Sequence, residues 1–167
     1  MTTTVRVSLL LRLRIWWNNH RANRKRGHRR RRRQALRVYA RLRQIDGAGA
    51  NARRLAYLRK VDPLAFEEMT LDAFERQGHR VLRNLRYTGD GGLDGRVMIR
   101  GVWHGIQCKR YGKNISWRHV TEFPHDLRRV GLERGIFVHT GRTPKGRLPP
   151  PGVQIISGQR LLELLLH

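Results

Sequence analysis

At 167 residues, the chain is long enough for one ordinary domain and an appendage. It carries 36 Lys and Arg against 12 Asp and Glu, a net charge of +24. A compact domain gains nothing from such an excess, because like charges repel one another in the folded state. We therefore expect a polyanionic partner, and the charge alone leaves open DNA, RNA or an anionic membrane face.

The charge is concentrated in the first part of the chain. Residues 1–60 contain 19 Lys and Arg and one acid, whereas residues 61–167 contain 17 Lys and Arg and 11 acids. Residues 5–17 are apolar with interspersed arginines, too short to span a bilayer, which takes about 20 apolar residues. The arginines also interrupt any signal-peptide core. Two interpretations stay open: an alternating strand, or an interfacial segment anchored by Trp16 and Trp17.

The remainder of this basic region is predicted to be an arm followed by a linker. Residues 20–43 are typical of a basic helix or a disordered arm, and residues 46–51 of a flexible linker. Within the arm runs an unbroken cationic series: Arg29, Arg30, Arg31, Arg32 and Arg33. The sequence thus predicts an N-terminal extension over 1–60 and a globular domain over 61–167.

The globular domain is predicted to alternate helices and strands. Asp62 and Pro63 indicate a helix start, with Asp62 as the N-cap, and Gly78 its end. Strands are expected over 79–85, 94–100 and 103–110, with a tight turn near Gly101, and a helix over 117–130 that Pro124 should kink or break. A buried strand over 135–140, a last strand over 153–157 and a helix over 159–166 follow. The order αβββαβ(β)α predicts an α/β fold with a mixed sheet flanked by helices.

Polar residues with catalytic potential fall on the predicted hairpin. Asp94 precedes Gln107 and Lys109, which point the same way along their strand because side chains alternate between faces. Ile106 and Cys108 should therefore enter the core while Gln107 and Lys109 face a cleft. A carboxylate, an amide oxygen and an ammonium together suit a divalent cation and an activated water.

Cys108 is expected to be a buried core residue rather than a nucleophile. As the single cysteine of the chain, it excludes an intramolecular disulfide framework and fits a reducing cytoplasm.

Residues 62–166 resemble the Mrr-like restriction endonuclease domain, a branch of the PD-(D/E)xK nuclease superfamily. The resemblance rests on Phe66-Glu67, on the segments 88–95 and 106–111, and on the later segments 135–140 and 155–165. It implies a restriction-endonuclease-like core, with a central mixed sheet flanked by helices in αβββαβ order, to which this chain adds its basic extension.

The resemblance also implies a divalent-metal-dependent endodeoxyribonuclease that hydrolyses the phosphodiester bonds of modified or foreign DNA. Asp94, Gln107 and Glu67 would bind Mg²⁺ or Mn²⁺, and Lys109 would orient the attacking water and oppose the phosphate charge. The cationic series of the arm and Arg110 are the expected contacts to DNA. A homodimer and peripheral membrane contact through residues 5–17 stay open, as does a decayed nuclease fold that binds DNA or RNA without turnover.

Each site residue also has a structural interpretation. Asp94 fits a turn residue beside glycine, and Asp90 fits either the glycine turn or the neighbourhood of the metal. Lys109 fits an exposed lysine on an edge strand. Glu67 fits a first-turn helix acid that the helix dipole favours.

Overall fold

The computed structural model describes residues 13, 17, 26–84 and 92–166. Its elements in chain order are α2 (Arg26–Gln44), α3 (Ala50–Leu58), α4 (Pro63–Arg76), β1 (Arg80–Arg83), β2 (Gly95–Ile99), β3 (Val102–Lys109), α5 (Trp117–Arg129), β4 (Gly135–His139), β5 (Val153–Ile156) and α6 (Gly158–Leu166). From α4 onward this is the predicted order, so the α/β prediction is confirmed. The predicted N-cap is also present, since the Ala65 N–H donates to Asp62 Oδ1 at 3.0 Å.

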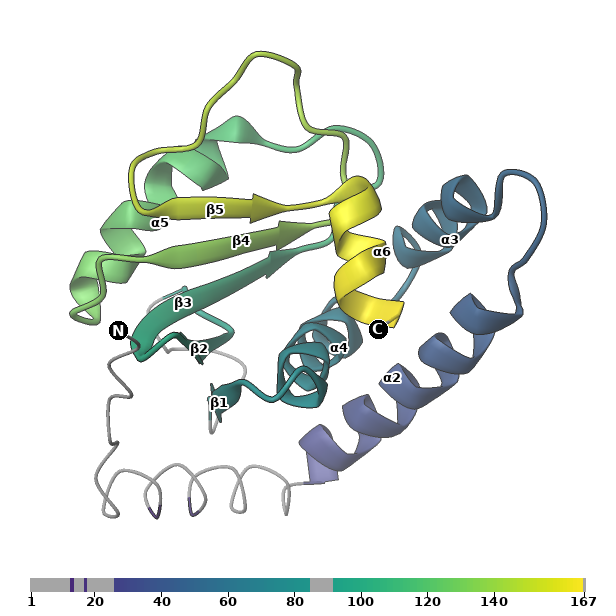
Figure 1. Ribbon diagram of the computed structural model, residues 1–167, viewed down its shortest axis with the longest axis horizontal. Coiled ribbons are helices and arrows are strands. Elements are labelled where there is room, and N and C mark those ends of the chain that lie inside the picture. The colour runs from purple at the N-terminus through teal and green to yellow at the C-terminus, as the bar shows by residue number, and fades with distance from the viewer. Residues whose placement is uncertain (1–12, 14–16, 18–25, 85–91, 167) are drawn as a thin grey trace, which may run out of the picture.

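The strands form one mixed sheet in the order β1-β2-β3-β4-β5 (Figure 1). β1, β2 and β3 pair antiparallel, as hairpin-connected strands do, whereas β4 and β5 add in parallel after the α5 crossover. The β2–β3 turn contains Arg100 and Gly101, both with positive φ, as a two-residue turn matched to the strand twist requires. The polar end of β3 therefore lies in the middle of the sheet.

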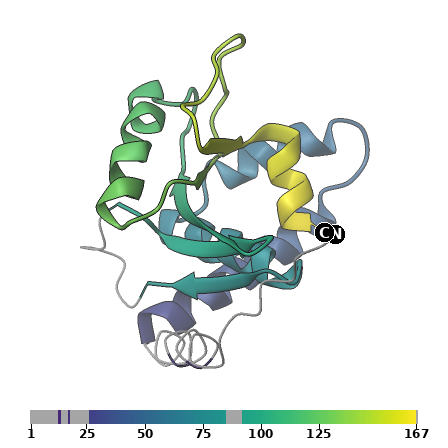
Figure 2. The ribbon, with the colours of Figure 1, turned by 60° about the vertical axis from the view of Figure 1, so that its left-hand side comes forward.

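Helices cover both faces of this sheet (Figure 2). On one face, α4 and α6 pack on Ile106 and Val138 through side chains such as Phe66 and Leu161. On the other, α5 packs its apolar face on Phe137. Strict alternation along β3 produces this division, because Ile106 and Cys108 enter the first core cluster as predicted.

α5 is seated by a pair of glycines on neighbouring strands. Gly105 of β3 and Gly135 of β4 are register partners, and together they leave a hollow in the sheet. A Cβ on Gly135 would come within 2.6 Å of Phe123 Cε1 and 2.7 Å of Leu127 Cδ1, so these two side chains of α5 fill that hollow. The glycines thus let α5 approach the backbone of the sheet closely.

Pro124 does not break this helix, since α5 runs without interruption from Trp117 to Arg129. A proline in a helix interior costs about 3 kcal/mol. Val120, Phe123 and Leu127 are buried on one face of α5, and each such side chain stabilises by about 1.5–3 kcal/mol. Burial of that face offsets the loss of one backbone hydrogen bond.

The basic extension contributes to the same core. Within the predicted arm, residues from 26 onward form α2, and Val38, Tyr39 and Leu42 join the core cluster that contains α4 and α6. Tyr39 also donates from its hydroxyl to the Met69 carbonyl at 2.6 Å. The predicted linker ends inside a helix, because α3 begins at Ala50. The predicted boundary at residue 60 falls between α3 and α4.

Most of the apolar segment 5–17 lies outside the described residues. Its two described members, Leu13 and Trp17, are helical, with 53% and 58% of their surfaces exposed. No helix among the described residues is long and apolar enough to cross a membrane.

Candidate active site

Asp94 lies directly before β2 and is bound to the backbone of β3 in two places. Its N–H donates to the Ile106 carbonyl at 2.8 Å, and its Oδ2 accepts a hydrogen bond from the Cys108 N–H at 2.6 Å. The turn interpretation of Asp94 is therefore incomplete, because the carboxylate is directed at the neighbouring strand. One carboxylate oxygen is occupied by this bond, and Oδ1 is the second acceptor.

Two side-chain amides hold the residues before Asp94. Gln107 donates from Nε2 to the Gly92 carbonyl at 2.6 Å, and Asn84 donates from Nδ2 to the Leu93 carbonyl at 2.6 Å. Gln107 is only 5% exposed, so it is more enclosed than a cleft-facing residue would be. Its Oε1 is the acceptor that this hydrogen bond leaves to the side chain. Sequence reasoning missed Asn84, since an asparagine at a strand end carries no local signal of a partner nine residues away.

Lys109 is the last residue of the central strand. It is paired in register with His139 of β4, and β2 lies on the other side of β3. This position contradicts the edge-strand interpretation of Lys109. His139 is fully buried, and burial lowers its pKa to about 4, so the ring beside Lys109 is neutral at physiological pH.

Glu67 approaches the site from α4. It is the fifth residue of this helix and not part of its first turn, which contradicts the helix-dipole interpretation. Burial raises the pKa of the Glu67 carboxyl to about 8, the charges of Asp94 and Glu68 add to this shift, and Lys109 opposes it. The charges of Asp94 and Lys109 thus both act on Glu67, although the three residues come from different elements.

The pKa of Asp94 is also raised, to about 6, by burial. The Cys108 N–H and the Lys109 ammonium oppose that shift, because both stabilise the ionised form. Burial thus favours the protonated form of both carboxyls, and the charge of Asp94 adds to this effect on Glu67. Two acids that resist joint ionisation next to a lysine are typical of catalytic sites.

The donor set fits a hard divalent cation. Among the residues that the structure describes, no group of three or more His, Cys, Asp and Glu side chains is placed to hold a metal ion. A cation here would rely on carboxylate oxygens of Asp94 and Glu67, the amide oxygen of Gln107, and water. Such oxygen ligands suit Mg²⁺, which keeps several waters. A positive charge would also offset the repulsion by Asp94 and Glu68, which adds to the effect of burial on the Glu67 pKa.

Cys108 supports the site through its backbone alone. Its thiol is buried, and its pKa lies well above the ordinary value because of burial and the nearby charges of Asp94 and Glu67. A thiol of this kind stays protonated and inert, in agreement with the core interpretation.

The expected DNA contacts divide into two kinds. Arg29, Arg30 and Arg33 are exposed on α2. Arg31 and Arg32, in contrast, form ion pairs with Asp62, the N-cap of α4, and with Asp72 of α4, with N–O distances of 2.9 and 3.2 Å. Arg110 is exposed directly after β3 and donates from Nη1 to the Arg59 carbonyl at 2.7 Å. Asp90 lies outside the described residues.

An aromatic pair that sequence reasoning missed lies two residues beyond Lys109. The Tyr111 hydroxyl is 2.6 Å from His119 Nδ1, and the two rings are stacked at an interplanar angle of 22°. Tyr111 and His119 are separated by a loop and the start of α5, so no helix or strand period relates them.

One known protein family matches the part of the chain that contains the candidate site. The Mrr_cat family model, described as a restriction endonuclease, matches residues 58–165. This range contains Glu67, Asp94, Gln107 and Lys109, and it excludes α2. Searches of curated proteins and of solved structures found no significant match.

Proposed function

Because this chain belongs to the Mrr-type restriction endonuclease family, whose domain implies DNA as the substrate, we propose that it is a divalent-cation-dependent endodeoxyribonuclease. The observation that carries the proposal is that the charges of Asp94 and Lys109 both act on the Glu67 carboxyl, and that Lys109 also acts on the buried Asp94 carboxyl. The metal dependence and the roles below belong to the same proposal.

In this proposal each side chain has a distinct task. Asp94, held by the Cys108 N–H, and Glu67 supply carboxylate oxygens to Mg²⁺ or Mn²⁺, and Gln107 supplies an amide oxygen. When bound, the cation polarises the phosphate and lowers the pKa of a water. Lys109 orients the attacking water and opposes the negative charge that grows on the phosphate in the transition state. The amides of Gln107 and Asn84 fix the backbone that presents Asp94.

Cleavage of supercoiled plasmid with Mg²⁺ or Mn²⁺ tests the proposal. We expect Lys109→Ala to lower the rate by about 100-fold or more, the usual effect of removing a positioned electrostatic group. DNA binding without the cation should persist in this variant. Lys145→Ala, which removes an exposed lysine from the loop before β5, is the matched control and should cut normally. Equal cleavage by Lys109→Ala and the control would refute the assignment.

Restriction-type specificity needs a separate comparison. We propose that modified or foreign DNA is the target, so methylated and unmethylated copies of one plasmid should be cut at different rates. Equal rates on both copies would contradict this part and leave the nuclease proposal intact.

A non-catalytic role is the second candidate. It is favoured by the donor set, since Gln107 carries no charge and the described residues offer no group of three or more acidic, His or Cys ligands. A decayed nuclease fold would bind DNA or RNA in a salt-sensitive way without turnover under any cation. Plasmid cleavage that depends on Lys109 would exclude it.

A further inference from the structure

Helix α2 separates its arginines onto two faces. The inward face carries the buried side chains of Ala35, Val38, Tyr39 and Leu42. Arg31 and Arg32 flank this face, and their guanidinium groups pair with Asp62 and Asp72 of α4. These two arginines therefore attach α2 to the catalytic core, and an uninterrupted run of arginines in the sequence is not one uniform surface.

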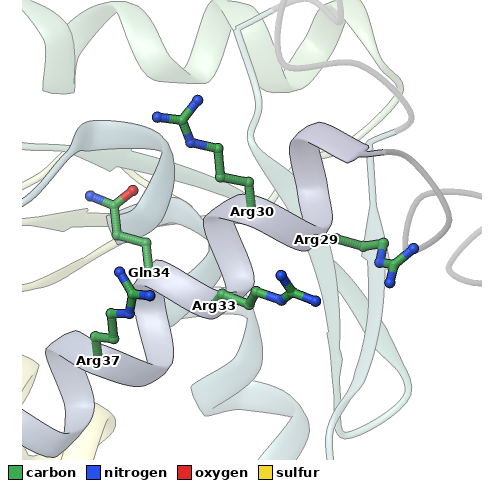
Figure 3. Close-up of a pocket in the computed structure, with 5 residues that line it drawn as sticks. All are labelled: Arg29, Arg30, Arg33, Gln34 and Arg37. Atoms are coloured by element: carbon green, nitrogen blue, oxygen red, sulfur yellow. The ribbon is translucent and has the colours of Figure 1, made fainter.

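The outward face of α2 carries a second set of arginines. With Gln34 they line a groove of about 630 Å³ along the helix (Figure 3); these arginines are Arg29, Arg30, Arg33 and Arg37. From Arg29 to Arg37 the helix rises by about 12 Å, at 1.5 Å per residue. α2 contains no Asp or Glu, so nothing on the helix itself neutralises this set, which we call the outer arginine face.

Charge repulsion within the outer arginine face disfavours the folded helix. Arg29 and Arg33, and then Arg33 and Arg37, are four residues apart, and like charges at this spacing repel each other. The core has its own ion pairs with α2, so these arginines are not needed to attach the helix. A ligand with regularly spaced negative charges would compensate the repulsion.

We propose that the outer arginine face binds the phosphate backbone of the substrate DNA, outside the region that the family model covers. The inference rests on the proposed nuclease function and adds to it a docking surface on α2. A DNA duplex presents one negative charge per about 1.7 Å of its axis, so 12 Å of helix faces several phosphates. The contacts are to the backbone and therefore independent of sequence.

The same face fits an anionic membrane poorly. An interfacial helix inserts its apolar side between the lipids. The apolar side of α2 is already buried against α4 and α6, and Leu36, 64% exposed, is the large apolar side chain that α2 presents to solvent. Charge complementarity thus remains as the mode of binding, and a polyphosphate backbone provides it.

α2 holds this surface in a fixed relation to the candidate active site. Arg31 pairs with Asp62, the N-cap of α4, and Glu67 lies on that same helix. The hydroxyl of Tyr39 also binds the Met69 carbonyl of α4. Phosphates seated on the outer arginine face would therefore bind to a surface that is rigidly attached to the element carrying Glu67.

Two double variants with equal loss of charge test the proposal. Arg29→Gln/Arg33→Gln alters the outer arginine face, and Arg31→Gln/Arg32→Gln alters the inner pair. Affinity for a duplex is measured against salt concentration without divalent cation, and folding is followed by thermal melting. Each lost phosphate contact lowers the slope of log affinity against log salt by about 0.9.

For the outer variant we expect the slope to become shallower by about two and the melting temperature to stay unchanged. Its affinity deficit should then shrink about tenfold between 50 and 200 mM salt. The inner variant should melt earlier and keep most of the slope. If the inner double variant is unfolded, the single variants Arg29→Gln and Arg31→Gln provide the same comparison. Arg29→Lys/Arg33→Lys should restore the slope, since a phosphate contact needs the charge.

Equal slopes for the outer and inner variants would overturn the proposal, because the salt dependence would then follow the number of charges and not their position. Loss of binding to anionic lipid vesicles with unchanged DNA affinity in the outer variant would also overturn it. Plasmid cleavage separates this inference from the function on which it rests. Salt-dependent DNA binding through the outer face without cleavage would refute the nuclease alone, whereas normal cleavage with an unaltered slope in the outer variant would refute the docking surface alone.

Discussion

Replacing Glu67 by glutamine should stabilise the protein at alkaline pH while it impairs the site. In the folded state the pKa of Glu67 is raised from 4.5 to about 8 by burial and by the charges of Asp94 and Glu68. The folded state therefore binds this proton more tightly than the unfolded chain does. The stability that the protonated form confers is fully present below pH 4.5 and is lost as the pH rises toward 8.

The size of the effect follows from this shift. One pKa unit corresponds to about 1.4 kcal/mol, so the full shift would amount to roughly 4–5 kcal/mol. Glu67 is partly exposed, and solvent screening reduces this figure; we expect about 2 kcal/mol. Glutamine cannot ionise and resembles the protonated acid. The advantage of the variant in free energy of unfolding should therefore be smallest at pH 5 and reach about 2 kcal/mol at pH 8, equivalent to about 4–8 °C in melting temperature.

Chemical denaturation at pH 5, 6, 7 and 8 without divalent cation measures this difference. Glu163→Gln, which removes an exposed acid on α6, is the control and should show no such trend. Added Mg²⁺ should stabilise the wild type at pH 8 more than Glu67→Gln, because the cation favours the ionised carboxyl. Parallel pH profiles for wild type and Glu67→Gln would refute the argument that burial and Asp94 hold Glu67 in its protonated form.

Two further predictions concern the scaffold around the site. Gly135→Ala should lower the free energy of unfolding by about 1–3 kcal/mol, since its Cβ would meet Phe123 and Leu127 at 2.6 and 2.7 Å. Thermal melting measures this loss, and an unchanged melting temperature would contradict the close packing of α5 on the sheet. Arg83→Met should lower the free energy of unfolding by about 3–5 kcal/mol, because Arg83 is 1% exposed and its removal leaves Glu68 buried without that charge. Urea denaturation measures this loss of stability. Adding Glu68→Gln to Arg83→Met should recover part of the lost free energy of unfolding. A double variant no more stable than Arg83→Met would argue against an uncompensated buried charge.

Much of the fold could be predicted because its signals are local. Asp62 and Pro63 start α4, and the alternation of Ile106, Gln107 and Cys108 predicts which side chains enter the core. N-capping and strand alternation depend on neighbouring residues, so they can be predicted from a single sequence. The continuity of α5 through Pro124 could not be predicted, because the local cost of a proline is visible in the sequence, whereas the burial that offsets it is not.

The candidate site could be predicted only in part from the sequence. Asp94, Gln107 and Lys109 could be selected by spacing and by resemblance, yet the hydrogen bond from Gln107 to Gly92 and the support from Asn84 join residues on different elements. The pKa shift of Glu67 likewise depends on Asp94, which is brought near it by folding. Such effects arise from burial and from distances through space, which no spacing along the chain encodes.

The roles of the charged residues were likewise only partly predictable from the sequence. Composition alone gives a net charge of +24 and predicts a polyanionic partner. The helical period could separate Arg31 and Arg32 from Arg29 and Arg33, but not say which pair faces the protein. That choice depends on where Asp62 and Asp72 lie once α4 has packed against α2. The amino-acid sequence thus specifies the elements and the total charge, and tertiary packing decides which charges stabilise the fold and which remain exposed to solvent.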